Sequence, residues 1–273
     1  MGKIIEKMQI FNFSTNKKLT LLKIILISVA ISDLHAQPAG REIVNQPIQW
    51  FAITTTMRIN DRINIYADTH LRYVESLDPM QYQLRIAGEW VISKKIAIIP
   101  LGYVYVRNFL YGKQPTTFEN NEHRIYQQAI LTYSSGKFGF NHRFRLEERL
   151  IQTHSLNQSG EVIDGGFDDN KQLRFRYRGV ITYPLNKEKI EAKTLFAMVY
   201  DELFVSWGKQ VTFHKPDQNR IFVGLGYQFT NDISLQSGLF YQMLIKANGA
   251  KQENNVGINT QFNYNFDLSK KKN

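Results

Sequence analysis

Arginine recurs at alternate positions in two stretches of the chain, and this spacing suits two kinds of chemistry. A guanidinium group is always charged and presents five N–H donors in one plane, so it binds carboxylates and phosphates through paired hydrogen bonds. Rows of such groups can hold a small dissolved anion, or they can hold acidic side chains of the same protein in ion pairs. The arginines of the two rows are Arg143, Arg145, Arg149, Arg174, Arg176 and Arg178.

The sequence contains little that could perform catalysis. The chain has no cysteine, which excludes cysteine nucleophiles, thiolate zinc sites and iron–sulfur clusters. No Gly-x-Ser-x-Gly motif occurs, and the adjacent Glu122 and His123 would face opposite ways on a strand, so they could not share a metal. We therefore expect no catalytic residue, no cofactor and no metal. The alternative is an outer-membrane lipid-modifying enzyme, for which His142 is the best available general base.

The formal net charge of +10 raises the question of a nucleic-acid partner. Nucleic-acid-binding proteins gather their basic residues in one exposed patch. Here the arginines recur with a period of two inside predicted strands, and the chain begins with an export signal, which is described below. We therefore expect no nucleic-acid partner.

The residues between the arginines decide which way the arginines face. Leu173, Phe175 and Tyr177 alternate with the second row, and successive side chains of a strand point to opposite faces. A soluble barrel would turn these apolar side chains inward, whereas a membrane barrel turns them to lipid and its polar side chains to a wet interior. An arginine at the midplane of the lipid face costs about 2–4 kcal/mol, so the pattern predicts a membrane barrel with arginine inside.

The same alternation extends through most of the chain beyond residue 37. Tight turns and longer polar loops follow one another in alternation, which is typical of outer-membrane barrels with short periplasmic turns and longer extracellular loops. The runs predicted as strands are 48–59, 63–73, 81–92, 96–109, 121–133, 137–152, 171–183, 190–205, 218–229, 233–246 and 254–268.

The number of runs is odd, whereas an antiparallel barrel that closes on itself needs an even number. The first and last runs would lie parallel, and a further strand between Gln37 and Pro47 would restore parity. Ten strands is the alternative if one run does not join the wall. The predicted fold class is therefore all-β, an antiparallel up-and-down transmembrane β-barrel of about 12 strands (10–12).

The N-terminal segment has the features of a secretory signal peptide. Lys17 and Lys18 precede an apolar stretch at 19–31, and Ala36 supplies the small residue before the expected cleavage point. An uncleaved anchor helix is the alternative, although such a helix needs roughly 20 apolar residues. We expect a signal peptide at 1–36 and one barrel domain at 37–273, located in the outer membrane of a Gram-negative cell.

That location implies the partners. We expect contact with outer-membrane lipid and, during insertion, with the barrel-assembly machinery. The aromatic alternation of the last predicted strand resembles the assembly signal of outer-membrane barrels. The alternative to a membrane-inserted barrel is a soluble periplasmic lipid binder.

Assigning alternate residues to the interior gives more arginines than acids there. The acids are Asp68, Glu89, Glu147 and either Asp201 or Glu202. One interpretation is an ion-paired filling of a narrow barrel, and the other is a positively biased pore or pocket for a small anionic solute such as phosphate, a sugar acid or a fatty-acid carboxylate. The interior arginines would be Arg72, Arg85, Arg124, Arg143, Arg145, Arg149, Arg174, Arg176, Arg178 and Arg220.

Five stretches, at 122–128, 142–149, 174–178, 200–204 and 217–227, occur in an order that resembles the domain-of-unknown-function family numbered 2490. Members of that family look like exported outer-membrane barrels of unassigned activity. The resemblance covers about residues 50–266 and implies a barrel in the outer membrane. It also implies that Asp201, Glu202, Asp217 and Arg220 join the arginine rows and Glu147 in one interior network.

Overall fold

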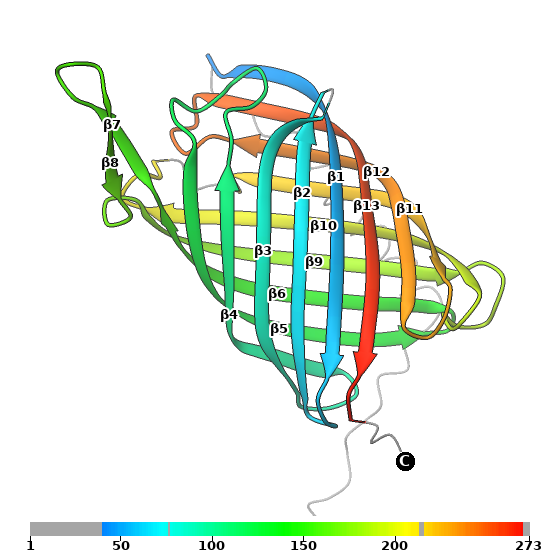
Figure 1. The fold of residues 1–273 in the computed structure, drawn as a ribbon. Coiled ribbons are helices and arrows are strands. Elements are labelled where there is room, and N and C mark those ends of the chain that lie inside the picture. Colours follow the sequence, from blue (N-terminus) through cyan, green and yellow to red (C-terminus); the bar gives the residue numbers. More distant parts are fainter. Residues whose placement is uncertain (1–39, 76, 213–215, 270–273) are drawn as a thin grey trace, which may run out of the picture. The chain divides into compact units, whose positions relative to one another are not determined.

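The computed structural model describes residues 40–75, 77–212 and 216–269, so the predicted signal peptide lies outside the described residues. The described part consists of strands joined by turns and loops (Figure 1). The strands are β1 (Glu42–Arg58), β2 (Ile63–Val74), β3 (Asp78–Val91), β4 (Ile96–Asn108), β5 (Asn120–Ser135), β6 (Phe138–Ile151), β7 (Thr153–Leu156), β8 (Val162–Gly166), β9 (Lys171–Pro184), β10 (Thr194–Gly208), β11 (Gln218–Gln228), β12 (Ile233–Ile245) and β13 (Lys251–Asp267).

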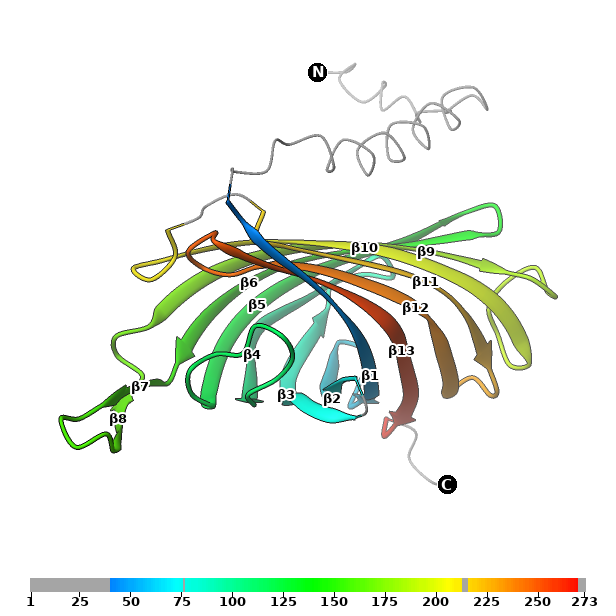
Figure 2. The same ribbon diagram turned by 90° about the horizontal axis from the view of Figure 1, so that it is seen from above.

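Eleven of these strands form one closed barrel in the order in which they follow along the chain. Each strand pairs antiparallel with the next, and β6 pairs with β9 across the segment that contains β7 and β8. β9 and β10 lie in the wall opposite β2 and β3 (Figures 1 and 2). The structure therefore confirms the all-β, up-and-down barrel that the alternation predicts.

The barrel closes through a parallel pair, β1 with β13, which runs from Glu42 beside Lys251 to Arg58 beside Asp267. Because a parallel ladder also satisfies the backbone N–H and C=O groups, closure does not require an even number of strands. The eleven strands fall within the expected range, but the additional strand proposed between Gln37 and Pro47 is wrong for the described part of that segment. Residues 42–47 are the start of β1, and 37–39 lie outside the described residues.

The eleven predicted runs match the eleven barrel strands, with boundaries that differ by a few residues. The clearest difference is the hairpin of β7 and β8, which lies in a segment predicted as loop. This hairpin projects from the barrel between β6 and β9 (Figure 1). It is a sheet of its own, so it does not add to the wall.

The two faces of the wall differ as the sequence predicts. On β9, Phe175 is 36% exposed and Leu173 is 44% exposed, whereas Arg174 and Arg176 are 7% and 5% exposed. Outward side chains are apolar on neighbouring strands too, for example Leu239 on β12, which is 70% exposed. The bulky apolar side chains thus cover the outside of the barrel, and the guanidinium groups point toward its axis.

The interior also contains aromatic side chains among the charges. One buried cluster joins Trp50, Phe222 and Phe240 with the stacked ring of Tyr200. A second cluster centres on Tyr126 and its neighbours Val104 and Val106. These rings pack against the arginines, so the interior of this barrel is filled and not a wide aqueous pore.

Candidate functional site

The predicted site residues come together on the inner faces of five neighbouring strands, β5, β6, β9, β10 and β11. Alternation aims every second side chain of each strand inward, and the register places these side chains in adjacent rows. The predicted site residues that are buried in the interior are Arg124, Arg143, Arg145, Glu147, Arg174, Arg176, Glu202 and Arg220, and Arg149 and Arg178 are half-buried beside them.

Glu147 on β6 is the first centre of this network and is completely buried. Arg174 Nε donates to its Oε2 at 2.9 Å, and Arg176 Nη1 donates to its Oε1 at 2.6 Å. Arg145 on the same strand lies 3.4 Å from Oε1. One carboxylate therefore holds three guanidinium groups, two of them from the neighbouring strand.

Glu202 on β10 is the second centre. Its Oε1 accepts from Arg143 and, at 2.8 Å, from Nη2 of Arg176. Arg220 lies farther away, with Nη1 3.9 Å from Oε2. Arg176 therefore bridges Glu147 and Glu202, which makes the two centres one continuous network.

Glu122 on β5 is a third centre, which the sequence reasoning missed. Arg124 donates to both of its oxygens, at 2.6 and 2.9 Å, and Arg149 on β6 binds the same carboxylate. The period of two was sufficient to find it, because Glu122 stands two residues before the inward Arg124. Glu253 is another buried acid that was not predicted. It lies near the start of β13, and the predicted strand began at residue 254, directly after it.

The described interior carries more positive than negative charge. Eight arginines are buried there against five carboxylates, an excess of three. Arg72 donates to the amide oxygen of Gln81 and has no carboxylate partner among the described residues. Arg178 has no hydrogen-bond acceptor among them at all.

Aromatic rings take the place of the missing carboxylates. The guanidinium carbons of Arg72 and Arg220 lie 4.2 and 4.8 Å from the centre of the Trp50 ring. Arg176 stacks on Phe204 at 4.6 Å, and Arg178 lies 5.7 Å from the ring centre of Tyr200. Such contacts stabilise a cation, but they leave its in-plane N–H donors available for an acceptor.

Asp201 does not belong to the interior network. Glu202 points inward, so its neighbour Asp201 points outward, where Asn219 Nδ2 donates to it at 2.6 Å. The inclusion of both residues in one network is therefore wrong for Asp201, because adjacent strand residues cannot share a face.

Asp217 precedes β11 at the long-loop end of the barrel and is half-buried. Burial raises the pKa of its carboxyl group, and the positive charges of Arg174 and Arg149 oppose this shift. Asp217 thus lies within electrostatic reach of the arginine rows, at their outer edge.

The loop between β4 and β5 covers the long-loop end of the interior. Tyr111 packs against the Trp50 cluster, and its hydroxyl donates to Glu253 at 3.2 Å. Lys113 N donates to the side chain of Gln46 at 3.1 Å, and the buried Gln114 donates to a carbonyl oxygen of β1. These contacts tie the loop between β4 and β5 to β1 and β13 at this end of the barrel.

His142, the candidate general base, lies on the outer wall. Its Nδ1 lies 2.8 Å from the Tyr177 hydroxyl, and its Nε2 lies 3.4 Å from the Tyr133 hydroxyl. No serine or threonine is bonded to it among the described residues. His142 is thus hydrogen-bonded to two tyrosine hydroxyl groups, and no nucleophile is bonded to it among the described residues.

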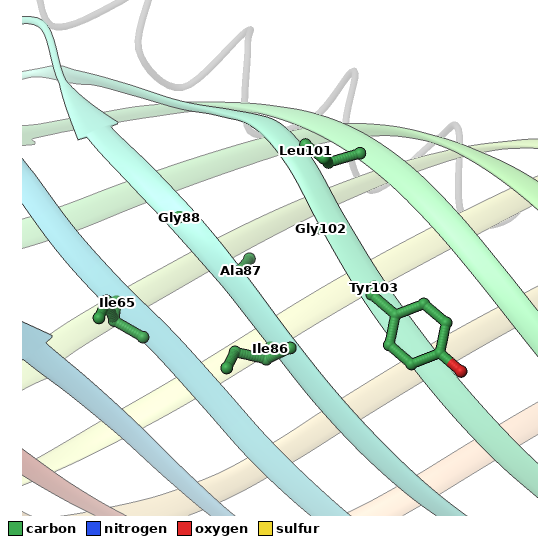
Figure 3. Close-up of a pocket in the computed structure, with 7 residues that line it drawn as sticks. All are labelled: Ile65, Ile86, Ala87, Gly88, Leu101, Gly102 and Tyr103. Atoms are coloured by element: carbon green, nitrogen blue, oxygen red, sulfur yellow. The ribbon is translucent and has the colours of Figure 1, made fainter.

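The outer wall also carries a shallow apolar groove across β2, β3 and β4, with a volume of about 310 Å³. Figure 3 shows Ile65, Ile86, Leu101 and Tyr103 around it, and Gly88, which has open space where a side chain would be, leaves room beside them. Its lining lacks charged side chains, so it offers no site for the chemistry of the arginine rows.

Two other features, a metal-binding cluster and a membrane-crossing helix, are absent from the part of the chain that the structure describes. The described residues contain no group of three or more His, Asp or Glu side chains that could hold a metal ion. They also contain no helix that is long and apolar enough to cross a membrane.

Comparisons with known proteins place this geometry in context. The sequence model of DUF2490, described as "Protein of unknown function (DUF2490)", matches residues 49–254. No curated protein matches the chain. Among solved structures, that of the NanC porin in a rhombohedral crystal form is similar with a TM-score of 0.44 and 12% sequence identity, covering 77% of this chain and 93% of that chain.

Proposed function

The chain belongs to the DUF2490 family of proteins of unknown function, and we propose that it is an outer-membrane β-barrel that forms a narrow, anion-biased channel. The observation that carries this proposal is the buried interior, in which eight arginines face five carboxylates. An interior with excess fixed positive charge attracts anions and repels cations.

The outside of the barrel supports a membrane location. Large apolar side chains cover it on every face, and exposed apolar surfaces of that extent are rare on soluble proteins. A closed barrel leaves no unpaired strand edge, which is what a lipid environment requires. We propose that the segment 1–36 directs export and is removed, and that lipid and the barrel-assembly machinery are the partners of the mature chain.

Planar-bilayer recordings on refolded protein test the channel. We expect small currents whose reversal potential in a KCl gradient indicates preference for chloride. Arg72→Gln removes an interior charge that has no carboxylate partner, so the preference should fall. Glu148→Gln, which changes a charge on the exposed outer face, is the control and should leave the preference unchanged. Cation preference in the unaltered protein would contradict the proposal.

A second candidate is a structural barrel without conductance, and the filled long-loop end favours it. Tyr111, Lys113 and Gln114 bind across that end, and the aromatic cluster occupies the space beneath them. A folded protein would then be silent in the bilayer. Heat-modifiable gel mobility separates this case from a failure to fold, since folded barrels resist SDS until they are heated.

A further inference from the structure

The interior differs between its two ends. Toward the tight turns, the inward side chains of Asn141, Thr182, Gln236, Asn259 and Gln261 are only half-buried. Toward the long loops, the charged side chains of the network are almost completely buried. Amide and hydroxyl side chains therefore lie on the inner face toward the tight turns, and the arginine network lies beyond them.

Counted from the tight-turn end, Arg143 and Arg178 are the first inward arginines of β6 and β9. They are direct cross-strand neighbours, and both point inward. Two like charges placed directly opposite each other on adjacent strands destabilise a sheet unless a counter-charge lies between them. The structure thus places two inward guanidinium groups opposite each other at the tight-turn edge of the network.

The nearest carboxylate does not neutralise this pair. Glu202 lies beside Arg178 in the register of β9 and β10, yet it is bonded to Arg143 and Arg176 and has Arg220 at 3.9 Å. One negative charge thus faces four arginines, of which only Arg176 has a second carboxylate partner, Glu147.

Both members of the pair have hydrogen-bond donors to spare. Nε of Arg143 and Nε of Arg178 are buried without an acceptor among the described residues. Arg143 uses one nitrogen for Glu202, and Arg178 uses none. Leaving a buried charged donor without an acceptor is costly, so two such donors on adjacent strands are suited to an acceptor that contacts both.

We propose that Arg143 and Arg178 bind a small dianionic oxyanion of the phosphate type. This inference rests on the channel proposed above and names the solute class of that channel. A phosphate group has enough oxygen atoms to accept from both guanidinium groups at once, and its two charges match the local excess better than one carboxylate does. Because the pair faces the interior, the ligand is a dissolved phosphate and not a lipid headgroup of the surrounding membrane.

Calorimetric titration of the refolded, full barrel in detergent micelles with inorganic phosphate tests the site, at constant ionic strength in chloride. We expect saturable binding that Arg178→Gln weakens at least about tenfold, since a charged hydrogen bond contributes roughly 1.5–3 kcal/mol. The matched control is Arg62→Gln, which removes the same charge from the exposed turn between β1 and β2, and its affinity should stay within about twofold.

The outcomes decide between clear alternatives. No saturable binding by the unaltered protein, or equal loss in Arg178→Gln and Arg62→Gln, would overturn the assignment. Acetate that displaces phosphate at equal concentration would also overturn it, because the site would then not require a dianion. If Arg178→Gln fails the heat-modifiable mobility test, Arg178→Lys keeps the charge and removes the planar donor set, and it should still weaken binding.

The bilayer recordings keep this inference distinct from the proposed function. Phosphate binding without conductance would remove the channel and leave the site. Anion-selective conductance with unaltered phosphate affinity in Arg178→Gln would remove the site and leave the channel.

Discussion

Replacing Glu147 by Gln tests whether the interior network holds the barrel together. Glu147 is completely buried and accepts from Arg174 at 2.9 Å and from Arg176 at 2.6 Å, with Arg145 at 3.4 Å. The substitution keeps the shape but removes the charge that these three guanidinium groups share. Breaking a buried ion pair by removing one partner costs about 3–5 kcal/mol, because the other charge stays buried without compensation. We therefore expect the free energy of unfolding to fall by about 3–5 kcal/mol.

Urea unfolding of the refolded barrel in lipid vesicles, followed by tryptophan fluorescence and by heat-modifiable mobility, measures this change. Asp61→Asn is the matched control, since Asp61 pairs with Arg58 in a turn and its side chain is 89% exposed. An exposed pair contributes about 0–1 kcal/mol, so the control should be close to the unaltered protein. If Glu147→Gln unfolds at the same urea concentration as Asp61→Asn, the view that this carboxylate neutralises the arginine rows is wrong.

The remaining predictions concern the wall, the closing pair and the interior. Phe175→Arg places a charge on the outer face, and near the bilayer midplane it should destabilise the inserted barrel by about 2–4 kcal/mol, as measured by urea unfolding. Glu148→Arg, on the exposed face of the neighbouring strand and nearer the interface, should change the stability little. Gly257→Ala would bring a Cβ atom into overlap with the Ile48 carbonyl of the parallel pair, so folded, heat-modifiable protein should be lost. Gly88→Ala, at a position with open space around it, should fold normally. Equal yields of the two folded variants would contradict the parallel closure. Because the chain has no cysteine, single-cysteine variants report on the access of one position at a time. A water-soluble maleimide should label Gln236→Cys on the inner face and not Leu239→Cys on the apolar outer wall. The reverse result would contradict the assignment of the inner and outer faces.

The sequence alone determined the strands and their faces. A period of two is a local property, because the direction of each side chain follows from the backbone of its own strand. The alternation of Phe175 with Arg174 and Arg176 therefore predicted both the strand and its orientation. The same rule, applied to Glu122 and Arg124, could have found the third acidic centre.

Other features depend on residues that are distant in the sequence. The choice between Asp201 and Glu202 needed the position of β10 relative to its neighbours, and the family resemblance, which included both, was wrong for Asp201. The hairpin of β7 and β8 and the closing loop at Tyr111 were likewise absent from the prediction. Loop conformation follows from tertiary contacts, such as the bond of Tyr111 to Glu253, and not from local periodicity.

The tertiary structure alone decided which charges share a partner. Arg176 bridges Glu147 and Glu202 because the registers place Glu147 opposite Arg174 and Glu202 opposite Arg178, one inward position to either side of Arg176. The same registers put Arg143 opposite Arg178 and Arg178 opposite Glu202, and they join β1 to β13 in parallel. The register between strands and the closure of the wall depend on how all the strands fit together, so no single stretch of sequence determines them. The face to which each side chain points is determined within its own strand.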